Sequence, residues 1–581
     1  MSSLRLKKSL PPMPRAFWAG LWLFFIAALA ACQPLPQASP PPEPEAAQAT
    51  PTPAPHTPAS TPTSAPSSTR TPTPSPTPPP ALIPGGRVLQ GGLHSVGKVD
   101  PQAGDLNPAE QQVADLLFES LLVPSPLDGR PDPALAEGWA FSPDGLEVTF
   151  HLREGVRWHD GTLLTAGDVV HALEEARDAT GGGILWPLLR PVLSVEAVGT
   201  QEVRVTFREP DCWAFWAVGQ VPLVRQDAEG RPVGTGPFRW AGQEADGRVA
   251  LEAFRAYWGL APYVDGWTYQ PFPDAGSLEQ ALGAGAVDVA LWPEEGAPAA
   301  WNPATGYALL PLPGETYFVL VFNARRAPLR DAAGRRALAA LVDRAALLQG
   351  MGGKGLILNA PLPSGHWALL AGAAPWAEVA LSSEGAQEAV AAAGWSDADG
   401  DGWLDFRGQP WVLAVEANAE NPRRVRVAQQ VAAQLRAAGI PAELRAVEWG
   451  VFLSDLASHT FDLAVLDLPF HAEPAACTLW REDTGRKGEP FNWPGLGDED
   501  LDLLRALLEA ARAVPGCQPE DRASRYASLW AWLDQERPFQ VLFSPARWLV
   551  ADPALKGLVA SPFRPWYWNL NRWYWTAEPG P

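Results

Sequence analysis

A proline-rich segment near the N-terminus divides this chain into parts that must behave differently. From Gln33 to Pro84 the residues are almost all Pro, Thr, Ser, Ala, Gln and Glu, and none is aromatic. Such a segment cannot bury enough apolar surface to offset the entropy lost on ordering. Its prolines favour an extended conformation that rises about 3.1 Å per residue. We therefore predict a disordered linker over residues 32–85 and a folded domain over residues 86–581.

The residues before this linker have the pattern of an export signal. Basic residues cluster among the first eight positions, and an apolar run follows from Ala16 to Leu29. This run is shorter than the ~20 residues that a membrane-spanning helix needs, which is typical of a signal peptide. It ends in Leu29-Ala-Ala-Cys32, which resembles the lipoprotein box of bacteria, in which the cysteine is acylated. We expect a signal peptide over residues 1–31 and a lipid anchor at Cys32.

Length and charge limit the class of the folded part. About 500 residues are too many for one hydrophobic core, which stops growing near ~250–300 residues, so two or more lobes are expected. The chain has 44 basic and 65 acidic residues, a formal net charge of -21. Nucleic-acid binding needs basic patches that displace counterions, so this balance argues against it.

Strand and helix patterns alternate along the folded part. Glu202–Phe207 alternates between polar and apolar residues, as a half-buried strand does. Pro108–Leu122 has helical spacing, with Asn107 as its N-cap and Pro108 at its first position. Asn421–Ala438 has the same spacing. Strands interspersed with helices predict an α/β architecture.

One long stretch resembles a known family. Pro133–Val169 is similar to the signature region of the family 5 solute-binding proteins, which bind peptides, nickel complexes and some sugars for ABC importers. Shorter blocks resemble the same family in the same order: Gly234–Phe238, Tyr257–Pro262, Gly285–Val289, Phe322-Asn323 and Gly439–Arg445. The resemblance covers nearly everything after Gly86.

The resemblance implies a two-lobed fold with an insertion. The family has the clamshell of the type II periplasmic-binding proteins, in which hinge closure encloses the ligand between two large lobes. Carried over to this chain, one lobe comprises about 86–125, 236–320 and 541–581. A smaller inserted lobe comprises about 126–235, and the other large lobe about 321–540.

The resemblance also implies where the charge of a ligand would be bound. In peptide binders of this family, an aspartate just after the strand that resembles Phe461–Val465 binds the N-terminal ammonium of the ligand. Pro469 to His471 occupies that place here. A buried ammonium without a counter-charge is costly. Either Asp467 or Glu473 therefore supplies the charge, or the ligand is not an ordinary peptide.

The tryptophans and cysteines give further candidates. Trp449 and Trp480 are candidates to stack on a ligand, and packing in the core is the alternative for each. Cys212, Cys477 and Cys517 allow three pairings and leave one cysteine over. We favour Cys477 with Cys517, because both fall in the second large lobe and flank one helix. Closing this loop of about 40 residues would contribute up to ~4 kcal/mol.

An acidic segment resembles a calcium loop. Asp397, Asp399, Asp401 and Asp405 stand at positions 1, 3, 5 and 9 of an EF-hand pattern, with glycine at position 6. Position 12 is Gly408 instead of the bidentate glutamate, and the flanking residues are more typical of a hairpin than of two helices. We favour an Asp- and Gly-rich turn over a calcium site, and we expect no metal and no cofactor.

These observations lead to one functional hypothesis. The histidines lack metalloprotease spacing and there is no Gly-x-Ser-x-Gly elbow, so we expect no enzyme. We expect an extracytoplasmic, lipid-anchored and monomeric binding protein that captures a peptide or similar small solute. It would deliver the solute to the permease subunits of an ABC importer. The alternatives are a sugar-binding or metal-chelate-binding protein of the same fold, or a sensor that presents its ligand to a receptor.

Overall fold

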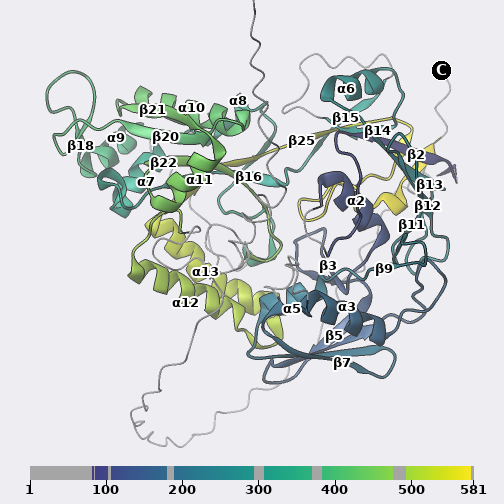
Figure 1. Ribbon diagram of the computed structural model, residues 1–581. Helices are drawn as coiled ribbons and strands as arrows, with labels where there is room; N and C mark the ends of the chain where they lie inside the picture. Colours follow the sequence, from purple (N-terminus) through teal and green to yellow (C-terminus); the bar gives the residue numbers. More distant parts are fainter. Residues whose placement is uncertain are drawn as a thin grey trace, which may run out of the picture. The chain divides into compact units, whose positions relative to one another are not determined.

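The fold of the chain was analysed in a computed structural model (Figure 1). It describes residues 82–83, 85–102, 106–178, 189–292, 306–369, 383–474 and 492–576. These residues belong to one compact unit, Ala81–Pro581. Among them, no helix combines the length and the apolar composition that a membrane span requires.

A seven-stranded sheet forms the centre of the first lobe. Its strands lie in the order β11-β12-β13-β2-β14-β25-β15, and β2 runs parallel to its neighbours β13 and β14. The bounds are β2 (Arg87–Gly92), β11 (Phe238–Gln243), β12 (Val249–Ala253), β13 (Gly266–Pro271), β14 (Val289–Leu291), β15 (Ala308–Leu312) and β25 (Arg547–Ala551). The helices of this lobe are α2 (Pro108–Leu117) and α6 (Ala275–Gly283).

Helix α2 begins where the sequence predicts and ends earlier. The side chain of Asn107 accepts hydrogen bonds from the first turn, and Glu110 completes a capping box, so the predicted N-cap is confirmed. The helix stops at Leu117 instead of Leu122, because Phe118 is extended and Leu122 already belongs to a strand. The segment that leaves the helix places Glu119 between the first lobe and the inserted lobe.

A five-stranded sheet forms the centre of the second lobe. Its order is β21-β20-β22-β16-β23, with bounds β16 (Thr316–Phe322), β20 (Leu413–Asn418), β21 (Ala442–Val447), β22 (Leu463–Pro469) and β23 (Phe539–Val541). Its helices are α7 (Ala332–Ala340), α8 (Arg344–Gly350), α9 (Ser383–Ala392), α10 (Pro422–Ala437), α11 (Trp449–Ser458), α12 (Asp498–Arg512) and α13 (Pro519–Glu536).

Both faces of this second sheet are buried. Phe318 and Leu320 in β16 alternate with Val319 and Val321, and the two pairs belong to different hydrophobic clusters. One cluster includes α10, and the other includes α11, α12 and α13. Helices therefore cover the sheet on its two sides, as the α/β pattern predicts.

The inserted lobe has a four-stranded antiparallel sheet of its own. The order is β5-β6-β8-β7, with bounds β5 (Ala136–Phe141), β6 (Glu147–Leu152), β7 (Val192–Val198) and β8 (Glu202–Phe207). Strand β8 has the predicted bounds and alternates between partly and fully buried residues. Helices α3 (Ala166–Asp178) and α5 (Cys212–Gly219) complete the lobe.

The remaining elements are short pairs and single turns. They are β1 (Leu82–Ile83), β26 (Leu555–Lys556) and β27 (Tyr574–Thr576), which form one sheet, and the pairs β3 (Leu122–Pro124) with β4 (Pro131–Pro133), β9 (Arg225–Gln226) with β10 (Pro232–Val233), β17 (Gly355–Ile357) with β24 (Phe543–Pro545), and β18 (Trp395–Ser396) with β19 (Asp405–Phe406). Short 3-10 helices span Ala327–Leu329, Trp367–Leu369, Pro515–Cys517 and Leu570–Arg572.

The chain crosses between the two large sheets at two places that lie side by side. One crossing is residues 313–315, between β15 and β16, and the other is residues 542–546, between β23 and β25. The hydroxyl of Ser544 donates a hydrogen bond of 2.7 Å to the carbonyl of Thr316. The expected boundary at residue 320 is therefore several residues late, because all of β16 already pairs in the second sheet.

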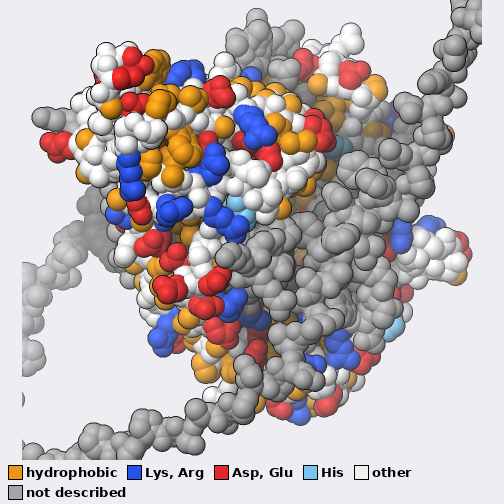
Figure 2. All heavy atoms as spheres, turned by 60° about the vertical axis from the view of Figure 1, so that its left-hand side comes forward, with side chains coloured by type: hydrophobic (Ala, Val, Ile, Leu, Met, Phe, Trp, Pro, Cys, Tyr) orange, Lys and Arg blue, Asp and Glu red, His pale blue; other side chains and the backbone are white. Residues whose placement is uncertain are grey.

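The surface of the second lobe carries mixed charges. Figure 2 shows acidic and basic side chains interspersed with apolar ones over the described part of this face. This pattern differs from the continuous basic surface that nucleic-acid binding uses.

Candidate ligand-binding cavity

A cavity of about 590 Å³ lies beside the two crossings. Its walls come from the carboxyl end of β2, from one face of α2, from the C-terminal segment 562–567, from Glu315 and Arg547 at the crossings, and from Phe470 just after β22. It is therefore built mostly by the first lobe, and Phe470 brings the second lobe to its wall. A volume of this size suits a small-molecule ligand.

One face of helix α2 supplies much of the polar wall. Pro108, Gln111, Gln112 and Asp115 follow one another at the i, i+3, i+4 and i+7 spacing of a helix face, and all four line the cavity. The opposite face carries Val113, Leu116 and Leu117, which are buried in the first lobe. The polar stripe of an otherwise apolar helix is thus turned toward the cavity.

Asp115 is the carboxylate that this face presents to the cavity. Its side chain remains exposed, while the phenol of Tyr567 and the amide of Gln111 each donate a hydrogen bond of 2.7 Å to it. Burial by the surrounding protein raises the pKa of Asp115 above its usual value, and these two hydrogen bonds lower it in part. A carboxylate that is accessible and yet enclosed by protein is placed to bind a polar group of a ligand.

Three further charged groups line the cavity. Glu315 and Arg547 form an ion pair with each other across the two crossings. Arg564 donates a hydrogen bond of 3.1 Å to the carbonyl of Pro124, and its guanidinium lies 5.5 Å from the ring centre of Trp568. Burial lowers the pKa of Arg564, and the charge of Asp115 opposes this effect.

The rest of the wall is neutral. Gln90 and Gln112 exchange two hydrogen bonds of 2.7 Å through their side-chain amides, so their polar atoms satisfy each other. Several aromatic side chains contribute to the apolar surface: Tyr269, Trp292, Phe470, Phe563, Trp566 and Tyr567. Apolar walls with a few placed polar groups are typical of pockets that bind small molecules.

The two acids that the sequence suggested as anchors are committed to arginines. Asp467, in β22, pairs with Arg424 at 2.5 Å and with Arg423 at 3.5 Å. Glu473 is 4% exposed; both of its oxygens accept hydrogen bonds of 2.8 Å from Arg522, and Tyr526 donates another of 2.7 Å.

Neither acid lines the cavity. Burial alone would lower the pKa of Arg522, but the charge of Glu473 raises it above its ordinary value. Each of the two acids has a cationic partner within the second lobe, so we propose neither Asp467 nor Glu473 as the ligand anchor.

The aromatic candidates divide between the described and the undescribed residues. Trp449 begins helix α11, where its ring stacks on Phe452 at 5.9 Å and lies under the guanidinium of Arg424 at 5.4 Å. It packs against the second-lobe core and does not line the cavity. Trp480 lies outside the described residues, as do Cys32 and Cys477.

The predicted pairing of the cysteines is wrong. Cys517 forms a disulfide with Cys212, with their Cα atoms 5.3 Å apart, and not with Cys477. Cys517 lies in the turn between α12 and α13, and this turn packs against the start of α5, where Cys212 is the first residue. The sequence favoured the nearer cysteine, whereas the fold brings together two residues 305 positions apart.

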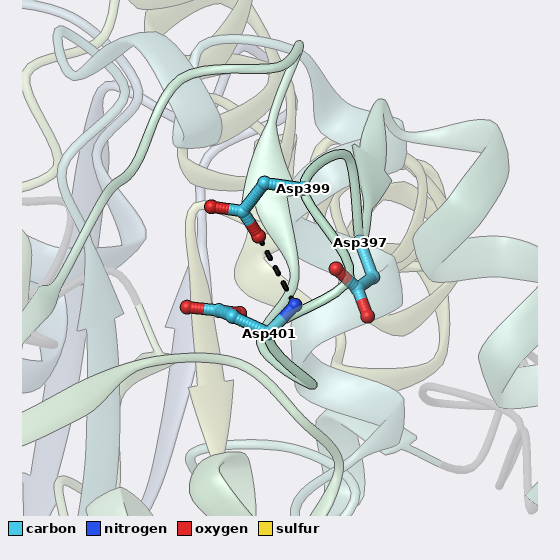
Figure 3. Close-up of side chains that lie close together, drawn as sticks. All are labelled: Asp397, Asp399 and Asp401. Atoms are coloured by element: carbon cyan, nitrogen blue, oxygen red, sulfur yellow. Dashed lines mark hydrogen bonds between the residues drawn. The ribbon is translucent and has the colours of Figure 1, made fainter.

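The acidic loop closes a hairpin, as its flanking residues indicated. Strand β18 pairs with β19 on either side of the loop. Asp397, Asp399 and Asp401 each offer an oxygen within 4.8 Å of the others (Figure 3), and all three residues are exposed. Their carboxylates accept hydrogen bonds from amides of the same turn, such as Gly400 to Asp397 at 2.7 Å. These bonds explain the aspartates as parts of a turn, the interpretation that the sequence favoured, and calcium binding is the alternative to be tested.

The sequence did not predict the cavity residues, because their spacing on a helix is not distinctive. The spacing of Pro108, Gln111, Gln112 and Asp115 on one face of a predicted helix is visible. It is also the pattern of an ordinary solvated helix face. Only the packing of residues 562–567 over that face makes it the wall of a cavity.

Comparison with known proteins agrees with this architecture. A family model described as "Bacterial extracellular solute-binding proteins, family 5 Middle" matches residues 130–475, more than half of the chain. Oligopeptide-binding protein AppA of Bacillus subtilis (strain 168) is 24% identical over 471 residues, covering 77% of this chain and 83% of AppA. Heme-binding protein A of Haemophilus influenzae is 25% identical over 502 residues, covering 79% of this chain and 86% of heme-binding protein A.

Solved structures show the same fold. AppA in complex with a nonapeptide has a TM-score of 0.63 at 22% identity, covering 86% of this chain and all of AppA. NikZ from Campylobacter jejuni in complex with Ni(L-His) has a TM-score of 0.65 at 20% identity, covering 85% of this chain and all of NikZ. The expected type II periplasmic-binding fold is therefore confirmed. The chain belongs to the bacterial extracellular solute-binding proteins of family 5.

Proposed function

We propose that this chain captures a peptide or a similar small solute in the cavity beside its two crossings and delivers it to the permease of an ABC importer. Proteins of this family are transport components without enzymatic activity. The observation that carries the proposal is the cavity itself, because Glu315 of one crossing, Arg547 directly after the other crossing and Phe470 of the second lobe meet the first lobe at its wall. A ligand that contacts all of them favours the closed arrangement of the lobes.

The crossings support a hinge role. A β-carbon at Gly314 would lie 2.2 Å from the hydroxyl of Ser544 and 2.3 Å from the carbonyl of Pro545, so the two segments are packed too closely for a larger residue. Two adjacent connections of this kind concentrate bending in a few residues. The ion pair between Glu315 and Arg547 joins the first crossing to the residue that directly follows the second crossing, at the edge of the cavity.

The ligand class rests on the relatives and on the walls of the cavity. The similar proteins are described as binding oligopeptides, heme or a nickel–histidine complex. A peptide fits the combination of aromatic walls and a few polar groups. A metal chelate is the second candidate, because the place of the family's ammonium-binding aspartate is held by Pro469 to His471 in this chain.

We further propose that Cys32 carries a lipid and that residues 33–84 tether the binding domain to the outer side of the cell membrane. The support is the short apolar run that ends at Leu29-Ala-Ala-Cys32. Replacement Cys32→Ala should move the protein from the membrane fraction to the soluble fraction after cell lysis. A variant that stays wholly with the membranes would show that the anchor lies elsewhere.

Native mass spectrometry of the purified protein tests the capture of a solute directly. We expect a monomer that carries a bound small molecule and loses it after partial unfolding and refolding. Adding the released molecule back should raise the melting temperature, and the rise should grow with the logarithm of its concentration above the Kd, as binding to the folded state alone requires. Protein that carries no molecule and gains no stability from peptides, sugars or metal chelates would refute the proposal.

A further inference from the structure

The cavity has one carboxylate whose direct partners are all neutral. Asp115 accepts hydrogen bonds from Tyr567 and Gln111, and no ion pair is formed by it among the described residues. Each of its two oxygens accepts one of these bonds, so each keeps a lone pair for another donor. The second acid of the cavity, Glu315, is already paired with Arg547.

We infer that Asp115 determines specificity by binding a cationic nitrogen of the solute, such as an ammonium group. This inference rests on the proposed capture of a solute in the cavity. A charged hydrogen bond to a carboxylate within an enclosed site is stronger than one between neutral groups. The aromatic side chains of Trp566 and Tyr567 line the same wall, and they suit an apolar group next to the cationic nitrogen.

In the second lobe, the place that corresponds to the family's ammonium-binding aspartate, Pro469 to His471, is not available for this role. Phe470 lies at the cavity wall, and its amide donates a hydrogen bond of 3.1 Å to the carbonyl of Glu315. The acids on either side of it, Asp467 and Glu473, are bound by arginines. The first lobe therefore presents a carboxylate that forms no direct ion pair among the described residues, although the charge of Arg564 acts on it, and the second lobe contributes an apolar contact.

A set of short peptides tests Asp115. We would titrate the wild type, Asp115→Asn and a surface control, Asp502→Asn on α12, with unblocked peptides and with the same peptides acetylated at the N-terminus. We expect acetylation to weaken binding to the wild type about 10- to 100-fold. Asp115→Asn should weaken binding of the unblocked peptides by a similar factor and remove the difference between the two sets. The control should behave as the wild type.

Two results separate the inference from the proposed function. Equal binding of blocked and unblocked peptides by the wild type, with Asp115→Asn unchanged, would overturn the role of Asp115 and leave solute capture standing. If no peptide binds, the molecule released from the purified protein takes their place in the titration. A released molecule without a cationic nitrogen would also overturn the inference.

A second, independent observation concerns the contact between the inserted lobe and the second lobe. Cys517 is 8% exposed and belongs to the hydrophobic cluster of the inserted lobe, where it is bonded to Cys212. Next to the disulfide, Arg512 makes two hydrogen bonds to Asp211, at 2.9 and 2.7 Å. Asp211 is 2% exposed and also caps helix α5. The tip of the α12–α13 pair is thus fixed in the inserted lobe (Figure 1).

The inserted lobe is also joined to the first lobe. The amide of Leu223 donates to the carbonyl of Glu119 at 2.9 Å, and the hydroxyl of Thr235 donates to the carboxylate of Glu119 at 2.9 Å. Because the main chain also enters the inserted lobe from the first lobe and returns to it, the covalent path closes on itself. It runs from the first lobe through the two crossings to the second lobe, and from there through the disulfide and the inserted lobe back to the first lobe.

From this closed path, the structure assigns the Cys212–Cys517 disulfide the role of a strap that limits how far the second lobe can move away from the cavity. Bending at the crossings alone would separate the tip of α12 and α13 from α5, and the disulfide prevents this separation. The cavity can then open fully only if the inserted lobe moves together with the second lobe, or if the strap is broken.

Hydrogen exchange and solution scattering test the strap without any ligand. All variants carry Cys477→Ser, so that the Cys212–Cys517 bond is the disulfide that the reductant can reach. We would compare oxidised protein, protein reduced with a phosphine, and the additional double replacement Cys212→Ser and Cys517→Ser. We expect reduction to raise the radius of gyration and to speed amide exchange at residues 313–316 and 542–546 about tenfold or more. The double replacement should match the reduced protein and should not respond to the phosphine.

The strap would be overturned if the reduced protein keeps its circular dichroism and shows unchanged scattering and unchanged exchange at both crossings. Faster exchange confined to the α12–α13 turn would overturn it too, because that result describes local loosening without movement of the lobe. The variant Arg512→Lys keeps the disulfide while weakening the neighbouring ion pair. It should leave exchange at the crossings close to that of the oxidised protein.

Discussion

The buried pair of Glu473 and Arg522 offers the sharpest test of the proposed site. Replacement Glu473→Gln removes the negative charge but keeps the size of the side chain. Arg522 would then be a buried cation, 4% exposed, that keeps the carbonyl of Ala511 at 2.9 Å, the hydroxyl of Tyr526 at 3.3 Å and the rings of Trp367 and Tyr526 as partners. Breaking a buried ion pair from one side costs about 3–5 kcal/mol. We expect the lower end of this range, about 3 kcal/mol, because glutamine can still accept one hydrogen bond.

Urea unfolding of the second lobe measures this effect. Trp367 and Trp530 pack around Tyr526 and contribute to the tryptophan fluorescence, which follows the unfolding of the whole domain. Replacing both partners, Glu473→Leu with Arg522→Met, should recover much of the lost stability, because neither charge is then left unpaired. Ligand affinity should stay within a few-fold of the wild type in each variant that is folded.

The opposite outcome would refute our reading of Glu473. If Glu473→Gln unfolds at the same urea concentration as the wild type but loses the ligand, the carboxylate binds the solute and is not a structural partner of Arg522. The prediction from the sequence would then be right, and the cavity beside the crossings would be the wrong site.

Three other predictions concern different parts of the chain. Burial raises the pKa of Glu119 to about 7, although three hydrogen bonds to its carboxylate act to lower it. The folded state therefore keeps a proton that the unfolded chain loses near 4.5. The free energy of unfolding should therefore fall by up to ~3 kcal/mol as the pH rises from 4.5 to 7, and urea titrations of Glu119→Gln should lack this slope. Gly314→Ala should lower the free energy of unfolding by about 1–3 kcal/mol because its β-carbon meets the other crossing, whereas Gly283→Ala, with open space around it, should not destabilise the protein. If the Asp397–Asp401 loop binds calcium, a chelator should lower the melting temperature; identical melting curves with calcium and with chelator would leave the loop as a turn.

Local features of the fold were predictable from the sequence. The N-cap at Asn107, the strand Glu202–Phe207 and the hairpin around the acidic loop depend on residues within a few positions of one another. Helix α10, at Pro422–Ala437, also falls within one residue of its predicted bounds. Such elements are set by capping, alternation and turn chemistry, which a short window of sequence contains.

Features that depend on distant contacts were not predictable in the same way. The partner of Cys517 is 305 positions away, and the arginine that neutralises Glu473 is 49 positions away on another element. Tyr567, which makes Asp115 part of an enclosed site, follows it by 452 positions. A single sequence gives the chemical character of each residue, whereas these roles depend on which residues the fold brings together.

The distribution of charge around the cavity suggests an order for binding and closure. Asp115 and Arg564 both belong to the first lobe, and the second lobe meets the cavity through the apolar ring of Phe470. A solute can therefore form its charged contacts with the first lobe while the lobes are apart. Closure would then add the apolar contact of Phe470 and exclude water, which strengthens the charged contacts already formed. In this order, Phe470→Ala should speed release of the solute more than it slows capture, while Asp115→Asn should weaken the first encounter complex itself. Stopped-flow measurements of the two variants would distinguish this order from one in which the second lobe binds first, because Phe470→Ala would then reduce the association rate as strongly as Asp115→Asn.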